Sequence, residues 1–323
     1  MSALLEVSDL RVTLGTSHGR ADALRGVSFA LERGGTLGLI GESGCGKSMT
    51  ALALMGLLPD GATVSGSIRF DGRELTSLDE DRLCSLRGDR IAMVFQEPMT
   101  ALNPLHPIGR QIAEPLRLHR GLDAAAARKE ALRLLERVLV PKASERLDAY
   151  PHQLSGGQRQ RVVIAIALAC GPDLLIADEP TTALDTTVQR EVLDLLDELR
   201  RDSGMALLLI SHNLDVMAAR VARLAVMYGG SIVESGPTQA VFERRAHPYT
   251  RGLFAARPTL GAPRATPLAT IPGRVPALHE MPAGCAFADR CTMAIDDCRT
   301  ALPPTAAVGA GHSVRCIRWE LPT

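Results

Sequence analysis

The sequence predicts an α/β fold with a mainly parallel sheet, and three observations predict it. Short apolar runs alternate with amphipathic helical segments along most of the chain. A glycine-rich segment, Gly41 to Ser48, stands between an apolar run and a helical segment. Hydrophobic residues make up 46% of the 323 residues, which is enough to bury a sizeable core. The length corresponds to roughly two domains.

The first hundred residues read mostly as strands. The apolar run at residues 37–40 ends at the glycine-rich segment, as expected of a buried parallel strand. A helix should follow over residues 48–58 and stop near Pro59 and Gly61. Asp71-Gly72 is a turn signal after a strand at residues 66–70. Further strands are expected over residues 4–7, 11–14, 23–31 and 91–95.

The rest of the chain changes character twice. Residues 97–153 begin with several prolines and continue with a strongly helical stretch at 124–138, which predicts a mostly helical insertion. Beyond about Gly236, proline and glycine become frequent and helical periodicity fades, which predicts a less regular C-terminal extension. Between these regions we expect a helix opened by Ser155, strands at 174–177 and 206–210, and helices at 187–203 and 214–221.

Composition excludes several classes of function. The formal net charge is zero, so the chain lacks the basic character typical of nucleic-acid binding, and no nucleic-acid partner is expected. No apolar run approaches the roughly 20 residues that span a bilayer. The first 14 residues lack the apolar region of a signal peptide. We therefore expect a soluble chain whose membrane role, if it has one, requires a partner.

The segment Gly41 to Ser48 fits the pattern G-x-x-x-x-G-K-S of a phosphate-binding loop. Its glycines allow successive N–H groups to point at phosphate oxygens, and the following helix adds its positive dipole end. Lys47 should reach the β- and γ-phosphates, and the Ser48 hydroxyl should bind Mg²⁺. A chance glycine-rich turn is the alternative, which the strand before it and the helix after it disfavour. The predicted nucleotide contacts are Gly41, Ser43, Gly44, Cys45, Gly46, Lys47, Ser48 and Met49.

Polar residues follow three of the predicted strands. Asp178 is expected to hold Mg²⁺ and Glu179 to act as the general base that polarises the attacking water. Gln96 could bind Mg²⁺ or orient that water, and His212 could sense the γ-phosphate. A solvated acidic loop, a surface glutamine and a structural histidine are the alternatives. The order of these residues relative to the glycine-rich loop favours the catalytic roles of Glu179, His212 and Gln96.

A second anion site is predicted at Ser155-Gly156-Gly157-Gln158. Ser155 is a good N-cap, and the free N–H groups of a helix N-terminus attract anions. Because the chain already has one phosphate loop, this segment suggests a nucleotide held between two subunits. Simple helix capping is the alternative.

With these segments in place, the chain resembles the ATP-binding cassette (ABC) ATPases. The segment from Leu154 to Arg161 resembles their signature, and Leu174 to Asp185 resembles their Walker B strand and D-loop. The resemblance covers residues 4 to about 235. It implies a RecA-like P-loop NTPase core at 1–96 and 154–235 with an antiparallel β subdomain, a helical signature subdomain at 97–153 and a C-terminal extension at 236–323. It also assigns Asp185 to the nucleotide site.

A narrower resemblance is to the ATPases of oligopeptide and dipeptide importers, which also include nickel importers. It rests on the segments Phe95 to Pro104 and His247 to Thr250. It rests also on the spacing of four cysteines near the C-terminus, where some members of that family hold a [4Fe-4S] cluster. Thiolates suit such a cluster, whereas zinc sites commonly use tighter cysteine pairs. An iron–sulfur cluster is the favoured prediction, with zinc or no metal as alternatives, for Cys285, Cys291, Cys298 and Cys316.

The resemblance implies ATP and Mg²⁺ as cofactors, a second ATPase subunit that is identical or a paralogue, and two transmembrane permease subunits. It also implies an extracytoplasmic substrate-binding protein and a peripheral location on the cytoplasmic face of the membrane. One position departs from the family, which usually has an adenine-stacking aromatic where this chain has Leu14. An exporter ATPase, a soluble ABC protein of translation or DNA repair, and a non-hydrolysing scaffold are competing interpretations. The single cassette, the segment after Gln96, and the presence of Lys47 and Glu179 disfavour them.

Overall fold

The structure is a computed structural model that describes residues 3–96, 101–182, 184–257 and 270–320. The described chain forms two compact units. One comprises Glu32–Gly35 and Ser77–Ile210, and we call it the helical unit. The other comprises Ala3–Leu31, Thr36–Thr76 and the described residues from Ser211 onward, and we call it the loop unit.

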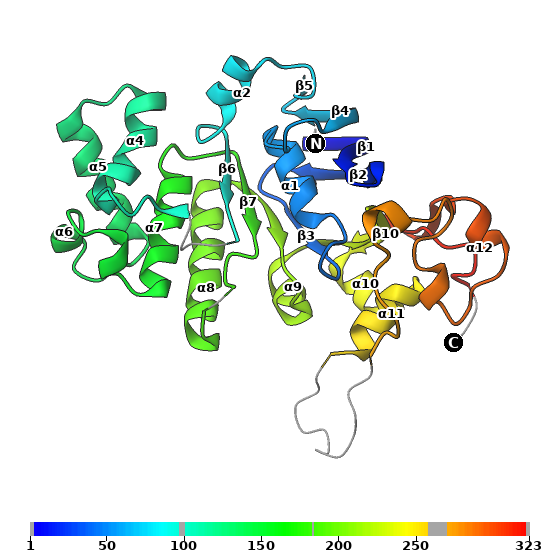
Figure 1. Cartoon of the computed structure of the whole chain (residues 1–323). Helices are drawn as coiled ribbons and strands as arrows, with labels where there is room; N and C mark the ends of the chain where they lie inside the picture. Colours follow the sequence, from blue (N-terminus) through cyan, green and yellow to red (C-terminus); the bar gives the residue numbers. More distant parts are fainter. Residues whose placement is uncertain (1–2, 97–100, 183, 258–269, 321–323) are drawn as a thin grey trace. The chain divides into compact units, whose positions relative to one another are not determined.

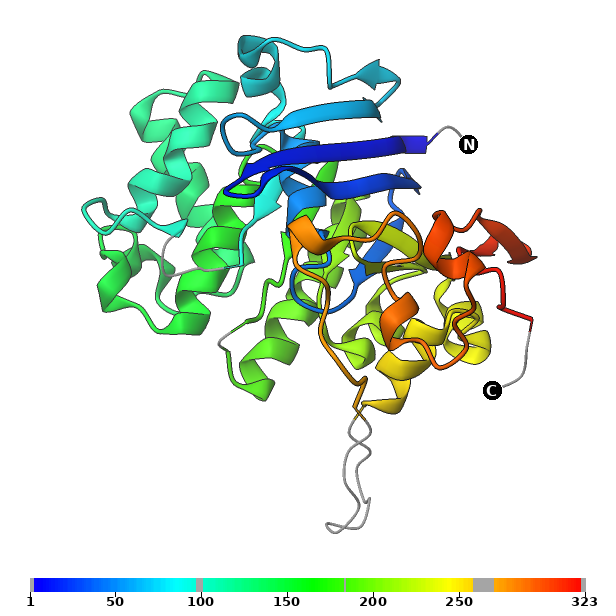
Figure 2. The ribbon, with the colours of Figure 1, turned by 45° about the vertical axis from the view of Figure 1, so that its right-hand side comes forward.

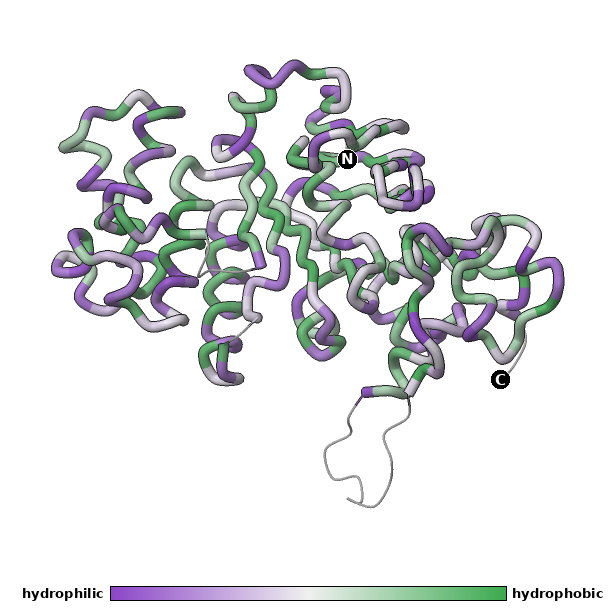
Figure 3. Tube along the Cα trace, in the orientation of Figure 1, coloured by the Kyte–Doolittle hydropathy of each residue, from purple (hydrophilic) through white to green (hydrophobic). Residues whose placement is uncertain are grey.

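The helical unit is built on three parallel strands. Their side chains are buried on both faces, which explains the continuous apolar runs in the sequence (Figure 3). Strand β7 pairs with β6 from Leu174↔Ile91 onward and with β8 from Leu174↔Ala206 onward. The strands are β6 (Ile91–Val94), β7 (Leu174–Asp178) and β8 (Ala206–Ile210).

Helices make up the rest of this unit. Helix α4 packs against α5 and α7, and α7 packs against α8 (Figure 1). Pro115 lies inside α4, where it marks no break in the helix. The helices are α2 (Glu80–Leu86), α4 (Ile108–Arg120), α5 (Ala124–Arg137), α6 (Ala143–Arg146), η1 (Pro151–Gln153), α7 (Gly156–Leu168) and α8 (Thr186–Ser203).

The loop unit contains an antiparallel sheet in the order β2-β1-β4-β5 (Figure 2). The two strands expected at residues 4–7 and 11–14 are one strand, because a register shift between Ser8 and Arg11 absorbs the turn-like residues, with Asp9 at a φ of 46°. Asp71 and Gly72 form the predicted two-residue turn, both with positive φ. The strands are β1 (Ala3–Thr16), β2 (Gly19–Glu32), β4 (Thr63–Phe70) and β5 (Arg73–Glu74).

A second group of strands in the loop unit runs in the order β11-β12-β10-β9-β3. Strand β3 pairs in parallel with β9, and the other pairs are antiparallel. The extension is less regular than the core, as predicted, but its strands β11 and β12 join this group through β10. The strands are β3 (Thr36–Ile40), β9 (Arg223–Tyr228), β10 (Ser231–Pro237), β11 (Ala306–Gly309) and β12 (His312–Val314).

The helices of the loop unit are short. Helix α1 begins directly after the glycine-rich loop and ends before Gly56, earlier than the sequence suggests. The elements are α1 (Lys47–Met55), α9 (Leu214–Arg220), α10 (Thr238–Arg244), α11 (Pro248–Ala255), η2 (Leu278–Glu280), η3 (Ala288–Arg290) and α12 (Asp297–Thr300). In the described part of the chain, none of the helices combines the length and apolar character needed to cross a bilayer.

Candidate functional site

The glycine-rich loop connects β3 to α1 in the loop unit. Gly41 has a φ of 154°, and a Cβ atom there would overlap the backbone oxygen of Met227. Gly46 has a φ of 105° and lies against Leu24, so a side chain at this position is strained as well. The two glycines that the phosphate-loop pattern requires are therefore the two that the packing requires.

Lys47 lies folded over the loop. Its Nζ donates to the backbone oxygens of Gly41 at 2.8 Å and Glu42 at 3.1 Å, and the residue is only 7% exposed. Burial raises the pKa of the neighbouring Cys45 thiol, which keeps that side chain neutral beside the loop. Ser43, Gly44 and Ser48 are exposed. The loop thus presents its tip and the first turn of α1 to solvent, where a phosphate can approach.

His212 lies with the loop in one cavity of about 590 Å³. The cavity is lined by Gly41 and Glu42 at the end of β3, by His212 and Asn213 before α9, and by residues of α11. The structure thus brings His212 to the phosphate loop within one unit. It also adds α11, from the predicted extension, to the surroundings of the loop.

In the helical unit, Gln96 and Glu179 meet at the carboxyl ends of β6 and β7. Gln96 Nε2 lies 3.4 Å from Glu179 Oε2, and Thr182 Oγ1 donates to the same oxygen at 2.9 Å. Glu179 has a φ of 46°, a conformation that non-glycine residues adopt mainly at functional sites and turns. Asp178, the last residue of β7, is buried. The carboxylates and the amide predicted for catalysis are therefore neighbours, while their roles stay predictions.

The segment Ser155 to Gln158 forms a capping box at the start of α7. Ser155 Oγ accepts from the N–H of Gln158 at 3.3 Å, and Gln158 Oε1 accepts from the N–H of Ser155 at 3.1 Å. Gly157 approaches α8 so closely that a Cβ atom would lie 2.7 Å from Val188 Cγ1. Helix α8 is itself capped by Asp185. The helix N-terminus predicted to attract an anion is therefore well formed and exposed.

The predicted site residues divide between the two units. The loop unit holds Gly41 to Met49 and His212, and the helical unit holds Gln96, Ser155 to Gln158, Asp178, Glu179 and Asp185. The Mg²⁺ ligands predicted at Ser48, Gln96 and Asp178 are shared between them and stay a prediction. Of the segment Phe95 to Pro104, residues 97–100 lie outside the described residues, as does Ala183 of the predicted D-loop.

The four tail cysteines lie close enough to affect one another. Burial, and after it the nearby Cys316, Cys298 and Cys291, raise the pKa of Cys285 to about 11. Three of the sulfur atoms accept a hydrogen bond from the backbone N–H two residues later in the chain, at Phe287, Met293 and Arg318. All four are free thiols.

The four thiols are not arranged in the geometry of a metal site. Over residues 3–96, 101–182, 184–257 and 270–320, no group of three or more His, Cys, Asp or Glu side chains is placed to hold a metal ion. Burial raises the pKa of Cys285, Cys291 and Cys316, which favours the neutral thiol over the thiolate that a metal requires. The geometry of the structure therefore does not support the predicted iron–sulfur cluster at Cys285, Cys291, Cys298 and Cys316.

Two residues near the loop escaped prediction from the sequence. The N–H of Glu42 donates to the hydroxyl of Tyr249 at 2.7 Å, and the carboxylate of Glu42 pairs with Arg290. A partial signal for Tyr249 was its place in the segment His247 to Thr250. No local pattern marks Arg290.

Comparisons with known proteins identify the family to which this chain is similar. The ABC transporter family matches residues 24–182, and the family "Oligopeptide/dipeptide transporter, C-terminal region" matches residues 233–298. A peptide import ATP-binding protein of Brucella melitensis is 48% identical over 98% of this chain and 97% of its own length. The oligopeptide transport ATP-binding protein OppD of Salmonella typhimurium is 47% identical over 98% of this chain and 94% of its own length.

A solved structure of similar fold is the dimeric ATP-binding cassette MJ0796 in a post-hydrolysis state bound to ADP and Pi. It is 29% identical with a TM-score of 0.65, covering 72% of this chain and 98% of that one. The chain belongs to the ABC transporter family of ATPases, in the branch that carries the oligopeptide/dipeptide transporter C-terminal region.

Proposed function

We propose that this chain is the ATP-hydrolysing subunit that energises the import of peptides through a membrane ABC transporter. The observation that carries the proposal is the strained, glycine-dependent phosphate loop at Gly41 to Ser48, because Gly41 and Gly46 adopt backbone conformations and close contacts that only glycine tolerates. The contact between Gln96 and Glu179 in the helical unit is a second, separate support. The names of the relatives, which are peptide import and oligopeptide transport ATP-binding proteins, supply the solute class.

ATP binding is proposed to require two copies of the cassette. Lys47 and Ser48 of one copy would face Ser155 to Gln158 of another, so that two ATP molecules are buried between them. The exposed loop tip and the exposed, capped N-terminus of α7 support this arrangement, because each offers N–H groups to an anion. The dimeric MJ0796 cassette bound to ADP and Pi supports it as well.

Within this arrangement we propose a role for each of the predicted site residues. Glu179 accepts a proton from the attacking water, and Gln96 and Thr182 hold its carboxylate in place. Ser48, Gln96 and Asp178 would hold Mg²⁺, which neutralises charge on the phosphates. His212, in the cavity beside Gly41, would contact the γ-phosphate. Gly41, Ser43, Gly44, Cys45, Gly46 and Met49 would shape the loop, and Asp185 would support the partner's site.

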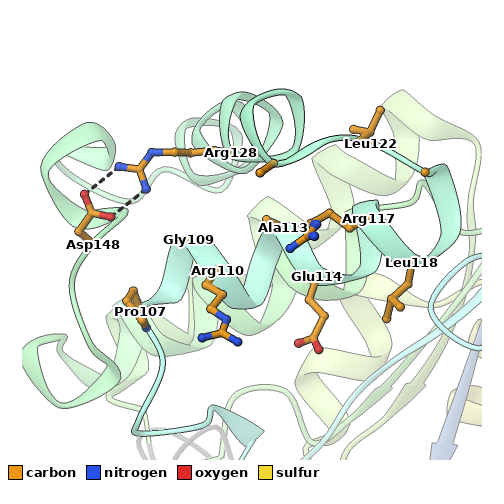
Figure 4. A pocket seen from close by; sticks show the side chains of 12 residues that line it. Pro107, Gly109, Arg110, Ala113, Glu114, Arg117, Leu118, Leu122, Arg128 and Asp148 are labelled. Carbon is orange, nitrogen blue, oxygen red and sulfur yellow. Dashed lines mark hydrogen bonds and ion pairs between the residues drawn. The ribbon is translucent and has the colours of Figure 1, made fainter.

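The helical unit offers a surface for the permease. A cavity of about 600 Å³ lies between α4 and α5 and is lined by Arg110, Glu114, Arg117 and Leu118, with the ion pair of Arg128 and Asp148 at its edge (Figure 4). Leu118 is 74% exposed. A mixed charged and apolar groove of this kind suits an amphipathic helix of a membrane subunit. We place the chain on the cytoplasmic face of the membrane with two permease subunits and an extracytoplasmic substrate-binding protein.

The four tail cysteines are proposed to bind a [4Fe-4S] cluster after a local rearrangement. The proximity of the four sulfur atoms and the N–H donors to three of them support the proposal. Anaerobically purified protein should contain iron, acid-labile sulfide and visible thiolate-to-iron absorbance. Cys298→Ser should remove all three, and Cys84→Ser, an exposed cysteine outside the tail, should leave them unchanged. Protein that carries zinc, or no metal under these conditions, would overturn the proposal.

The import function is tested by reconstitution of the native assembly. The complex that co-purifies with this chain is placed in vesicles with ATP and the binding protein, and uptake of labelled di- and oligopeptides is measured. Uptake should depend on ATP and disappear with Glu179→Gln. Uptake of a nickel complex without peptide uptake would contradict the proposed solute class, and ATP-driven efflux would contradict import.

A further inference from the structure

Glu42, the second residue of the phosphate loop, is held from three directions. Its N–H donates to Tyr249 Oη at 2.7 Å, and its backbone oxygen accepts from Lys47 Nζ at 3.1 Å. Its carboxylate accepts two hydrogen bonds from Arg290, at 2.6 Å and 3.1 Å. Tyr249 and Arg290 both come from the region beyond residue 236 and belong to the same unit as the loop. The predicted extension therefore contacts both the main chain and the side chain of the loop.

The guanidinium of Arg290 is fixed independently of Glu42. Its Nε donates to the backbone oxygen of Pro272 at 2.8 Å, and Nη2 donates to that of Ile271 at 3.1 Å. Nη1 also donates to Tyr228 Oη at 3.1 Å. The Arg290 side chain is 6% exposed and that of Glu42 is 29% exposed. A partly buried, bidentate pair with this many additional hydrogen bonds restricts the orientation of the carboxylate and is screened by salt less than an exposed pair.

The side chain of Tyr249 is also held in place by its neighbours. It is fully buried, and its ring centroid lies 4.6 Å from that of Tyr228 and 5.4 Å from that of Phe287. Phe287 also packs edge-on against Tyr228 at 5.2 Å and precedes the η3 turn that ends at Arg290. The N–H of Arg290 donates to the backbone oxygen of Phe287 at 3.0 Å. The aromatic cluster of Tyr228, Tyr249 and Phe287 thus supports both groups that hold Glu42.

We propose that Arg290 is a positioning residue for the phosphate loop, acting with Tyr249 to fix the backbone at Glu42 in the conformation that binds phosphate. The C-terminal extension then preorganises the nucleotide site, and part of the affinity for ATP depends on a contact made 248 residues away in the sequence. The inference rests on the proposed binding of ATP by this loop and adds residues from outside the cassette to it.

A double-mutant cycle on the purified full-length chain tests this. Arg290→Gln and Glu42→Gln should each raise the Kd for MgATP on the order of tenfold, and the double variant should raise it no further, because both remove the same contact. Arg290→Lys keeps the positive charge but loses the two parallel N–H donors of the guanidinium. Its Kd should therefore lie between those of the wild type and of Arg290→Gln. Tyr249→Phe should weaken binding independently. At saturating ATP the Arg290→Gln, Arg290→Lys and Tyr249→Phe variants should retain the wild-type kcat.

Arg299→Gln is the matched control, because it removes an exposed ion pair with Asp289 in the same extension. It should leave the Kd unchanged. An unchanged Kd in Arg290→Gln and Glu42→Gln, or losses that multiply in the double variant, would overturn the inference. If Arg290→Gln does not fold, Glu42→Gln and Tyr249→Phe decide it alone. Wild-type protein that binds no ATP would overturn the proposed function and the inference together, whereas tight wild-type binding with unaffected variants overturns only the inference.

Discussion

Glu179 is the residue on which the proposed chemistry depends most directly. Its backbone is in the left-handed conformation, Gln96 Nε2 lies 3.4 Å from its carboxylate, and Thr182 donates to the same oxygen. Glu179→Gln preserves the shape of the side chain and its capacity to bond with these neighbours, but an amide cannot accept a proton from water.

We expect Glu179→Gln to bind ATP as the wild type does and to lose about 10²-fold or more in turnover. The measurements are MgATP binding by calorimetry and phosphate release by the same preparation. Glu198→Gln, an exposed carboxylate on α8, is the control and should hydrolyse ATP at the wild-type rate. Turnover at the wild-type rate in Glu179→Gln would remove this residue from the role of general base.

His247 gives a prediction about pH. Its Nδ1 accepts the N–H of Tyr249 at 3.0 Å and so caps α11, which requires the neutral imidazole. Burial, together with the charge of Arg251, lowers the pKa of His247 to about 3. The unfolded chain, with a histidine pKa of about 6.5, therefore takes up a proton that the folded chain excludes. Stability from this group is present above about pH 6.5 and is lost as the pH falls toward 3.

The free energy of unfolding should fall by up to about 1.4 kcal/mol per pH unit in this window because of His247. Asparagine can cap a helix but cannot titrate, so His247→Asn should flatten the dependence by that slope. Denaturant titrations between pH 7 and 4 measure it. The exposed His152→Asn should keep the wild-type slope, and an identical slope in His247→Asn would show that His247 does not cause the loss.

At the scale of elements, the start of α7 combines two functions that can be separated. Ser155 caps the helix, and the same N-terminus is proposed to face the ATP of a second copy. Ser155→Ala removes the cap and should lower the free energy of unfolding by about 1 kcal/mol. Ser155→Asp restores a capping oxygen but adds a negative charge beside the proposed anion site.

We therefore expect Ser155→Asp to recover the stability that Ser155→Ala loses, and to hydrolyse ATP more slowly than Ser155→Ala does. Equilibrium denaturation and ATPase rate on the three proteins provide the comparison. If Ser155→Asp hydrolysed ATP at the wild-type rate, the segment would be a helix cap and nothing more.

The elements also show which parts of the fold are predictable from sequence. Local patterns were sufficient for β3, for the glycine-rich loop, for the start of α1 and for α8, because the apolar periodicity and the loop glycines that mark them lie within each segment. The end of α1 was placed too late, since the helix ends before Gly56. Strands β9 and β10 were missed, although Gly229-Gly230, both with positive φ, form the two-residue turn between them and are a recognisable hairpin signal. The contact of Arg290 with Glu42 could not be predicted, since no period or spacing relates residues so far apart.

At the scale of the whole molecule, the proposed site is incomplete in one copy of the chain. In the proposed arrangement, the N–H groups of the glycine-rich loop and those at the start of α7 meet at one nucleotide only when two cassettes associate, so hydrolysis should depend on protein concentration. We expect the ATPase rate per chain to rise with concentration and to level off once the dimer is saturated. In the dilute limit the rate per chain should be proportional to concentration, because the active species forms from two copies.

Light scattering on the same samples measures the fraction of dimer, and Glu179→Gln, which is proposed to bind ATP without turning it over, should show the largest dimer fraction in ATP. Lys142→Gln, which alters an exposed lysine of the helical unit, should follow the wild-type curve. A rate per chain that stays at its maximum in samples shown to be monomeric throughout the assay would contradict the shared site. It would also leave the capped N-terminus of α7 without the proposed role in ATP binding, because a site that one copy can complete needs no contact from a second copy.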